Sequence, residues 1–334
     1  MSIYGDVAKD LLKRFPDKPI RQLSRIAYKE NPKLFMNLEN AYQRMRYWTG
    51  TQGQYHRKQI KPESIRPPEQ GELLHANPFG LPESDNNDWS PIKFPIKKGR
   101  GILLYDLHLP YHDVGAITVS LQWSLKNKFS DFIVFAGDLL DCYQLSKFEN
   151  NPGKRDFASE LDILKKFFIA IRKKYTHATI IWKHGNHESR FERYLKRKAP
   201  ELFGLKDFVW RKYLDLDNLG IDLIKADIPM YVGKLNIIHG HEMPSSYSVV
   251  NPARGAYLKA MECIIEGHYH RTSLHAEKSF SGRLDTAWSV GCLCNLNPEY
   301  ARINKWNHGF AAMEVDGKDF TIRNWRIIEG TLVR

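Results

Sequence analysis

The sequence predicts an α/β domain that follows a small all-α domain. The main evidence is five short apolar runs, whose content of Ile, Val, Leu and Phe is typical of buried strands. They read GILLY, DFIVFA, TIIWKH, KLNII and ECIIE, and all of them follow residue 100. A basic first segment with helical periodicity and a proline-rich stretch behind it complete the pattern. The hydrophobic fraction of 42% is enough for a sizeable core.

Residues 1–60 are predicted to form a basic helical domain, with helices over 3–15, 19–30 and 33–49. Pro19 suits a first helical turn, Asn31-Pro32 ends the second helix, and Gly50 suits a carboxyl cap. Residues 1–66 hold 14 Lys or Arg and six Asp or Glu, a difference of +8 within the chain's formal net charge of +12. This segment therefore carries most of the excess positive charge.

The second and third predicted helices, joined by a short break, resemble a helix-turn-helix. The last helix would offer polar and cationic contacts to nucleic acid from Asn37, Asn40, Gln43, Arg44 and Arg46. The alternative is a basic three-helix cap that packs on the following domain or dimerises. We expect nucleic acid to be a partner; the oligomeric state stays open.

Residues 61–98 are predicted to be a linker, because seven prolines and the polar run ESDNND at 83–88 favour an extended segment. Trp89 and Phe94 are apolar and could anchor part of it to the domain at 99–334. In that domain, amphipathic helices are expected over 113–127 and 159–175, and a loop and helix over 244–262. The alternating segments GFAAMEV and FTIRNWRII predict antiparallel strands after residue 270.

A polar motif follows each of the five apolar runs. The motifs are Asp106-Leu107-His108, Gly137-Asp138, Gly185-Asn186-His187-Glu188, His239-Gly240-His241 and Gly267-His268-Tyr269-His270. Open α/β sheets bind ligands at the carboxyl ends of their strands, so these side chains are expected to gather there. Carboxylates, imidazoles and one amide oxygen suit a pair of divalent ions.

This order of motifs resembles the calcineurin-like metallophosphoesterases of bacteria and their viruses, over roughly residues 99–330. Each motif alone occurs by chance, but five in order are a specific pattern. The resemblance implies a four-layer αββα metallophosphoesterase sandwich, with two mixed sheets packed face to face and helices outside. It also implies an enzyme, a metal-dependent phosphoric ester hydrolase.

The resemblance also implies a set of metal ligands. Asp106, His108 and His270 would hold the first ion. Asn186, His239 and His268 would hold the second, and Asp138 would bridge the two. A hydroxide shared by two such ions attacks phosphorus. We expect two divalent ions, manganese first, with iron, zinc or nickel as alternatives.

Other residues are candidates for the chemistry or the substrate. By the resemblance, His187 would be the general acid or a charge stabiliser, and Asp141 would orient it; Asp141 could equally be a turn residue. Arg190 would clamp a phosphate or belong to a solvated basic helix face. His241 and His112 are further candidates for substrate contact, with structural roles as the alternative.

Departures from the family pattern leave the substrate open. Ser/Thr protein phosphatases of this superfamily carry G-D-x-x-D-R-G, whereas Cys142 follows Asp141 here, and His184 stands where those enzymes usually have Arg. With the basic first domain, we expect a phosphodiesterase or nuclease acting on DNA or RNA. The alternatives are a phosphomonoesterase acting on phosphoproteins or small phosphates, and a nucleic-acid-binding adaptor with little or no activity.

The sequence contains no apolar run of 18 residues and no apolar leader at its start, so we expect no membrane span and a cytoplasmic protein. It has four cysteines, and Cys292-Leu293-Cys294 has the wrong spacing for a zinc knuckle or a redox pair. We therefore expect reduced, buried thiols.

Overall fold

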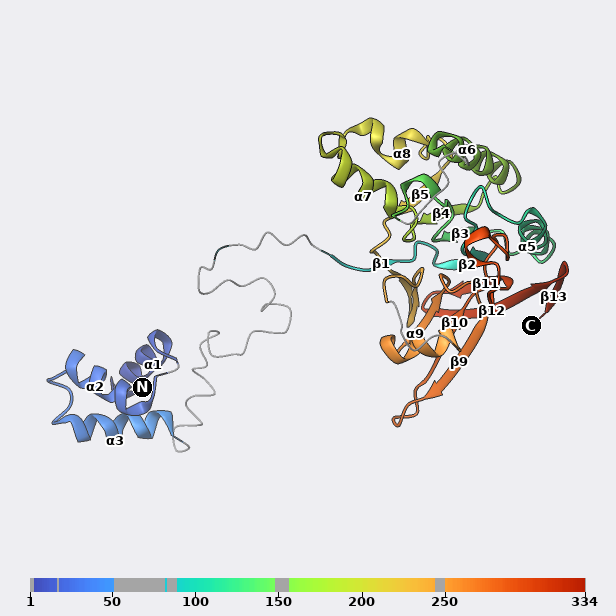
Figure 1. Cartoon of the computed structure of the whole chain (residues 1–334). Helices are drawn as coiled ribbons and strands as arrows, with labels where there is room; N and C mark the ends of the chain where they lie inside the picture. The colour runs from blue at the N-terminus through green and yellow to red at the C-terminus, as the bar shows by residue number, and fades with distance from the viewer. Residues whose placement is uncertain are drawn as a thin grey trace. The chain divides into compact units, whose positions relative to one another are not determined.

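The computed structural model describes residues 3–16, 18–50, 82, 89–147, 156–243 and 250–333. The chain divides into two compact units, an amino-terminal unit of residues 1–86 and a carboxy-terminal unit of residues 87–334 (Figure 1). Most of the predicted linker lies outside the described residues. None of the helices in the described ranges combines the length and the apolar character that crossing a bilayer requires.

The amino-terminal unit consists of α1 (Ile3–Arg14), α2 (Ile20–Glu30) and α3 (Leu38–Thr49). Their apolar stripes meet in one small core that includes Leu11, Leu23 and Met45. This confirms the predicted all-α region. The third helix begins at Leu38 rather than at residue 33, because the Asn37 side chain accepts a hydrogen bond from the Asn40 amide and caps the helix there.

The link from α2 to α3 therefore spans residues 31–37. A helix-turn-helix has a turn of about three or four residues. The longer link departs from that geometry, and the helix-turn-helix resemblance stays a prediction.

The carboxy-terminal unit contains two sheets. The seven-stranded sheet has the order β13-β12-β11-β2-β3-β4-β5. Its strands are β2 (Lys98–Leu104), β3 (Phe132–Ala136), β4 (Thr179–Lys183), β5 (Ile221–Ile224), β11 (His308–Asp316), β12 (Asp319–Ile328) and β13 (Thr331–Val333). β2 to β5 are parallel, and β11 and β12 add an antiparallel edge as predicted.

The six-stranded sheet has the order β1-β6-β7-β8-β10-β9. Its strands are β1 (Ile92–Lys93), β6 (Met230–Val232), β7 (Leu235–Ile237), β8 (Cys263–Glu266), β9 (Ser273–Lys278) and β10 (Leu284–Ser289). β1 pairs with β6, and Phe94 is buried between the sheets. The predicted linker boundary at residue 98 is therefore too late: backbone pairing joins the segment from Ile92 onward to the carboxy-terminal unit.

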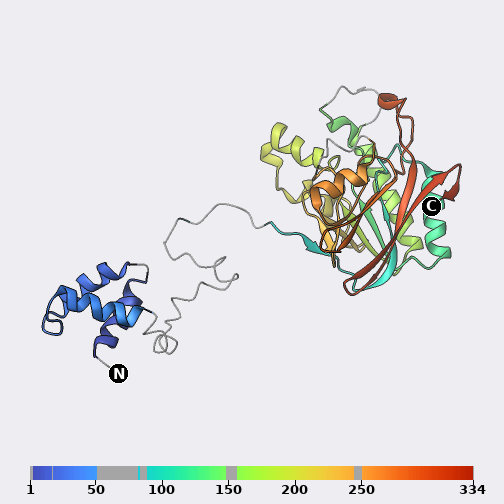
Figure 2. The same ribbon diagram turned by 90° about the horizontal axis from the view of Figure 1, so that it is seen from below.

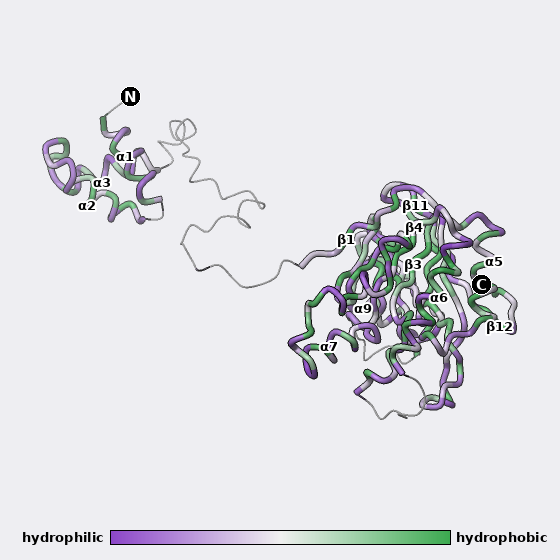
Figure 3. Tube along the Cα trace, turned by 90° about the horizontal axis from the view of Figure 1, so that it is seen from above, coloured by the Kyte–Doolittle hydropathy of each residue, from purple (hydrophilic) through white to green (hydrophobic). Residues whose placement is uncertain are grey.

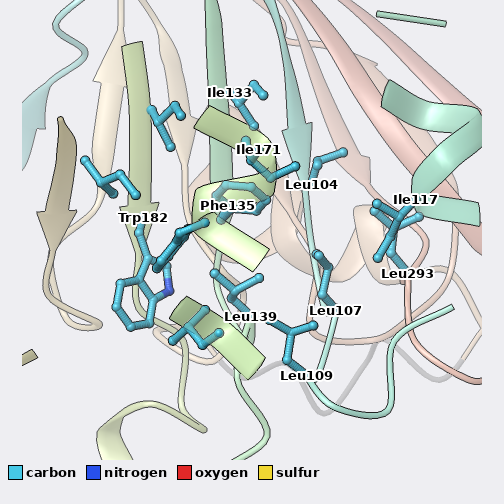
Figure 4. Close-up of a cluster of buried hydrophobic side chains, with 14 of the residues drawn as sticks. Leu104, Leu107, Leu109, Ile117, Ile133, Phe135, Leu139, Ile171, Trp182 and Leu293 are labelled. Carbon is cyan, nitrogen blue, oxygen red and sulfur yellow. The ribbon is translucent and has the colours of Figure 1, made fainter. Parts of the chain in front are cut away.

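Side chains that alternate along the strands build the layers. Ile133 and Phe135 of β3 face helices, whereas Phe132 and Val134 face the second sheet. The helices on the first side are α5 (Val114–Lys126) and α6 (Phe157–Lys174). Figure 4 shows this core, in which Ile171 of α6 and Ile117 of α5 lie with Leu104 and Phe135.

On the far side of the six-stranded sheet, α9 (Pro252–Ala260) packs through Ala256 and Tyr257. The order helix, sheet, sheet, helix is the predicted four-layer αββα sandwich (Figure 2). β3 and β4 lie at its centre and are mostly hydrophobic (Figure 3). Two further helices, α7 (Ser189–Lys198) and α8 (Trp210–Tyr213), follow β4.

Candidate dinuclear metal centre

The five motif-bearing runs all form strands, but in two sheets rather than one. The first three are β2, β3 and β4 of the seven-stranded sheet, and the last two are β7 and β8 of the six-stranded sheet. Hydrogen bonds bring the loops after them together. The Asp106 amide donates to the Gly137 carbonyl within one sheet, and the His268 amide donates to Asp106 Oδ2 at 2.8 Å between the two sheets. The site therefore forms where the carboxyl ends of two packed sheets meet.

Asp138 lies between two groups of side chains. On one side, His108 Nε2 and His270 Nε2 are 3.2 Å apart, and His270 Nε2 is 3.3 Å from Asp106 Oδ1. On the other side, His239 Nε2 is 3.2 Å from Asp138 Oδ2, and His268 belongs to the same cluster of ligand atoms. His108 Nε2 is also 3.9 Å from Asp138 Oδ2. One carboxylate oxygen thus faces both groups.

The histidines are anchored so that Nε2 faces the centre. His108 Nδ1 lies 3.0 Å from Asp141 Oδ2, and His239 Nδ1 lies 3.2 Å from the Ala136 carbonyl oxygen. With the proton held at Nδ1, Nε2 keeps a lone pair for an ion. His270 Nδ1 faces Cys294 Sγ at 3.9 Å.

The donor set fits a pair of divalent cations. Asp106 Oδ1, Asn186 Oδ1 and His239 Nε2 are buried and have no hydrogen-bond partner among the described residues. Buried polar atoms normally have partners, and a cation would satisfy all three. The seven predicted ligands are consistent with that interpretation, and two of them, Asp106 and Asn186, supply these unpaired oxygens.

Burial opposes ionisation of Asp138, but His187 and His239 more than offset it and hold its pKa well below its ordinary value. Burial also opposes protonation of His239, yet Asp138 and Asp106 raise its pKa to about 9. Protons and metal ions compete for the same lone pair on His239. Metal uptake should therefore weaken as the pH falls.

Glu188 holds two ligand loops together, a function that the sequence did not reveal. The fully buried carboxylate accepts hydrogen bonds from the amides of Gly185 at 2.7 Å, Leu140 at 2.9 Å and Asp138 at 3.2 Å. Those amides belong to the loops after β3 and β4. The Glu188 carboxylate therefore positions the backbone of both loops instead of facing the centre.

His187 and Asp141 lie together, although not in the predicted way. The Asp141 carboxylate bonds to His108, while His187 Nδ1 bonds to the Asp141 carbonyl oxygen at 2.8 Å. His187 Nδ1 is 3.6 Å from Asp141 Oδ2, and its Nε2 is 3.7 Å from Asp138 Oδ2. The prediction that Asp141 orients His187 is corrected: it does so chiefly through its backbone, because its carboxylate holds a different histidine.

Arg190 belongs to the site rather than to a solvated helix face. Its side chain is 15% exposed, Nη2 lies 3.0 Å from His187 Nε2, and Nη1 donates to the Asp141 carbonyl oxygen at 3.0 Å. Burial lowers the pKa of His187 to about 4, so its ring is neutral near pH 7 and Nε2 accepts from Arg190. The guanidinium is thus held beside the candidate acid.

The other predicted substrate residues lie in different surroundings. His241 is partly exposed, and its ring lies 5.3 Å from that of His239, next to the second ligand group. The His112 ring instead faces Phe167 of α6, at 6.4 Å. His241 therefore lies next to the second ligand group and His112 beside Phe167, and substrate contact by either residue stays a prediction.

Aromatic and sulfur-bearing side chains border the first ligand group, and the sequence did not reveal them. The ring of Trp306 lies 4.1 Å from that of His270, and Tyr300 packs on Trp306 at 6.3 Å. All four cysteines are free and buried, as expected. Cys294 groups with His108 and His270 within reach of one ion.

Three of the five residues predicted to contact nucleic acid have local partners. Asn37 caps the helix, and Gln43 donates to Glu39 at 2.8 Å. The guanidinium of Arg44 lies over the Tyr4 ring at 4.8 Å. Gln43, Arg44 and Arg46 are nevertheless exposed, and Asn40 is partly buried. Nucleic-acid contact by these five residues stays a prediction.

The family model of calcineurin-like phosphoesterases matches residues 106–277, which include every predicted metal ligand. A search of curated proteins finds no match. Similar solved structures include vacuolar protein sorting 29 from Cryptosporidium parvum, with 13% identity and a TM-score of 0.40, covering 71% of this chain and 96% of that one. Wild-type Vps29 complexed with zinc, from Entamoeba histolytica, has 12% identity and a TM-score of 0.35, covering 70% of this chain and 96% of that one.

Proposed function

Because the chain belongs to the calcineurin-like phosphoesterase family, we propose that it is a two-metal phosphodiesterase that cleaves nucleic acid. The observation that carries the proposal is Asp138, whose Oδ2 faces His239 on one side and His108 on the other. A carboxylate in that place can serve two ions at once. When bound, a pair of ions supplies a nucleophile derived from water and neutralises the phosphoryl oxygens.

The residues beside the ions would bind the substrate phosphate and protonate the leaving group. Arg190 offers N–H groups next to His187 Nε2, where a phosphoryl oxygen can accept them. When a phosphate accepts these hydrogen bonds, His187 Nε2 loses its hydrogen bond from Arg190 and is free to bind a proton. The Asp141 carboxylate, 3.6 Å from His187 Nδ1, then favours a protonated ring that can give a proton to the leaving oxygen.

Nucleic acid is the proposed substrate because of the charge of the chain. Residues 1–66 carry +8 of the chain's formal net charge of +12, and cationic side chains bind phosphate backbones by releasing counterions. A phosphomonoesterase is the second candidate. It is favoured by the placement of Arg190, which could clamp a terminal phosphate.

A panel of three substrates tests the proposal: bis(p-nitrophenyl) phosphate, p-nitrophenyl phosphate and DNA, each with manganese. A nucleic-acid phosphodiesterase should turn over the diester and DNA well above the monoester. Turnover of the monoester alone would replace the proposal with the second candidate. No turnover of any of the three by the fully metallated chain would favour the adaptor.

Metal content tests the bridging carboxylate directly. We expect about two ions per chain after reconstitution, and loss of both in Asp138→Ala, because Asp138 faces both ligand groups. Asp162→Ala, at an exposed position of α6, is the matched control and should keep both. Elemental analysis that finds at most one ion per wild-type chain would contradict the two-metal proposal.

A further inference from the structure

The segment from Ser189 to Tyr213, here called the α7–α8 arm, begins directly after the ligand loop of Asn186. It consists of α7, two short 3-10 turns (Pro200–Leu202 and Lys206–Phe208) and α8 (Figure 1). The ring of Trp210 in α8 packs on Phe191 of α7 at 4.9 Å, so the arm is one packed body. Its start is therefore fixed beside the metal centre.

One face of α7 is cationic and begins at the site. Arg190, Arg193 and Arg197 are spaced by three and four residues, which places them on the same side of the helix. Arg193 Nη2 donates to the Asn186 carbonyl oxygen at 2.7 Å, and both Arg193 and Arg197 are exposed. Neither forms an ion pair within the described ranges. The arm as a whole holds eight Lys or Arg against three Asp or Glu.

The same arm exposes large rings. Four aromatic side chains are between 39% and 49% exposed: Tyr194, Phe203, Phe208 and Tyr213. The Lys196 ammonium lies over the Phe203 ring at 4.7 Å. Large exposed apolar side chains that gather in one segment mark an interaction site. Rings among cations suit single-stranded nucleic acid, because its bases stack on aromatic side chains while its phosphates pair with Lys and Arg.

We propose that the α7–α8 arm binds single-stranded nucleic acid and leads the strand toward the metal centre. This rests on the proposed function, because the strand would be the substrate of that site. Charge complementarity favours a polyanion over an apolar protein partner, and exposed rings favour unpaired bases over a duplex, whose bases stack on each other.

The test uses the full-length protein and two double variants. Arg197→Ala with Lys206→Ala removes two exposed cations, and Phe203→Ala with Tyr213→Ala removes two exposed rings. Lys166→Ala with Lys173→Ala removes the same charge from exposed positions of α6 and is the matched control. All of these residues lie outside the metal centre, and circular dichroism checks the fold of each variant.

Binding of a fluorescein-labelled twenty-residue oligothymidine, followed by anisotropy in EDTA, needs no catalysis. Each arm variant should raise Kd by about tenfold. In the charge variant, the slope of log K against log salt concentration should also be shallower by about 1.4, which is about 0.7 for each of two lost phosphate contacts. The control variant should match the wild type. Unchanged Kd in both arm variants, or an equal loss for duplex DNA, would overturn the proposal.

Kinetics separate the arm from the proposed function. With manganese, both arm variants should lower kcat/KM for the oligonucleotide about tenfold, chiefly through KM, and leave turnover of bis(p-nitrophenyl) phosphate unchanged. Equal loss on both substrates would mean that the arm supports the fold, which would overturn the inference. Failure of the wild type to cleave any nucleic acid would defeat the proposed function, and the anisotropy result would still decide whether the arm binds the strand.

Discussion

Five of the predicted metal ligands have backbone φ angles between 48° and 66°: Asp106, His108, Asp138, His268 and His270. This left-handed region disfavours residues that have a Cβ atom, and such conformations persist where the surrounding structure enforces them. The motifs predicted which side chains would gather. They did not predict this conformation, because it arises from loops that meet across two sheets.

Glu188 is the group that enforces the position of two of these loops. Glu188→Gln keeps the shape of the side chain. It replaces one carboxylate oxygen, which accepts a hydrogen bond from a backbone amide, with an NH₂ group, which can only donate. With one of the three amide bonds lost, we expect metal affinity to fall by roughly 10–100-fold. Titration with manganese measures it, and Glu192→Gln on the same helix is the control. Equal affinity in Glu188→Gln and wild type would show that the loops do not depend on this carboxylate.

His187 lies beside the ligands, and its proposed role is in turnover. His187→Ala should keep two ions per chain and lose about 10²–10⁴-fold in turnover of an alkyl phosphodiester, whose leaving oxygen needs a proton. The loss should be smaller for a p-nitrophenyl ester, because nitrophenolate leaves unaided. His177→Ala, at an exposed position, should behave as wild type. A His187→Ala protein with full activity on the alkyl ester would remove the general-acid role.

His184 should make stability depend on pH. It lies buried against Trp182 and Trp210, and burial lowers its pKa to about 3. Between its ordinary value of 6.5 and about 3, the unfolded chain binds a proton that the folded protein does not. Stability therefore falls as the pH drops below 6.5.

His184→Phe should remove this contribution. Between pH 7.5 and 5.0 in EDTA, the wild type should lose about 2 kcal/mol more stability than the variant, from 1.36 kcal/mol per pKa unit over about 1.5 units. Urea unfolding followed by tryptophan fluorescence measures the difference, and His177→Gln is the control. Parallel losses in wild type and His184→Phe would refute the assignment to His184.

At the scale of elements, the apolar runs predicted every strand that carries a ligand. They did not predict the division between the sheets, since a short buried strand looks the same in either sheet. β1 was also missed, because two residues paired with β6 leave no periodicity to detect. The start of α3 was placed five residues too early, because the capping bond of Asn37 depends on geometry that the helical pattern does not contain.

Asn37 offers a test that separates capping from recognition. Asn37→Ala should destabilise the amino-terminal unit by about 1 kcal/mol through the lost cap, whereas Asn37→Ser should keep most of that stability. Thermal unfolding measures both variants. If Asn37 also contacts DNA, both variants should lose affinity; if only Asn37→Ala does, the residue acts through the helix alone.

At the scale of the whole molecule, the chain joins a basic helical unit to a metallophosphoesterase unit that contains all the candidate ligands. The sequence predicted this division from the shift in charge and composition. It placed the start of the second unit at residue 99, because a strand pairing of only two residues, Ile92 and Lys93, leaves no pattern to detect; the expected anchor Phe94 is buried in that unit. Nor did it reveal the α7–α8 arm, whose exposed rings look like core residues in the sequence.

Removal of residues 1–60 should leave the metal centre folded, because every candidate ligand lies beyond residue 105 and the core of α1 to α3 is its own. The truncated protein should hydrolyse bis(p-nitrophenyl) phosphate at a rate similar to that of the full chain. Its affinity for DNA should fall, and the salt dependence of binding should become shallower, since fewer phosphate contacts release fewer counterions. Gel-shift titration at two salt concentrations measures both changes.

The rival interpretation, a packing or dimerisation cap, makes a different prediction for the same truncation. Under this interpretation, the truncation leaves DNA affinity and its salt dependence unchanged and alters the oligomeric state, which light scattering detects. Residual binding by the truncated protein has a definite source under our proposals, because the α7–α8 arm remains. Adding Arg197→Ala and Lys206→Ala to the truncated protein should therefore remove most of the remaining affinity for single strands. If residual binding survives that change, the strand binds to another part of the carboxy-terminal unit.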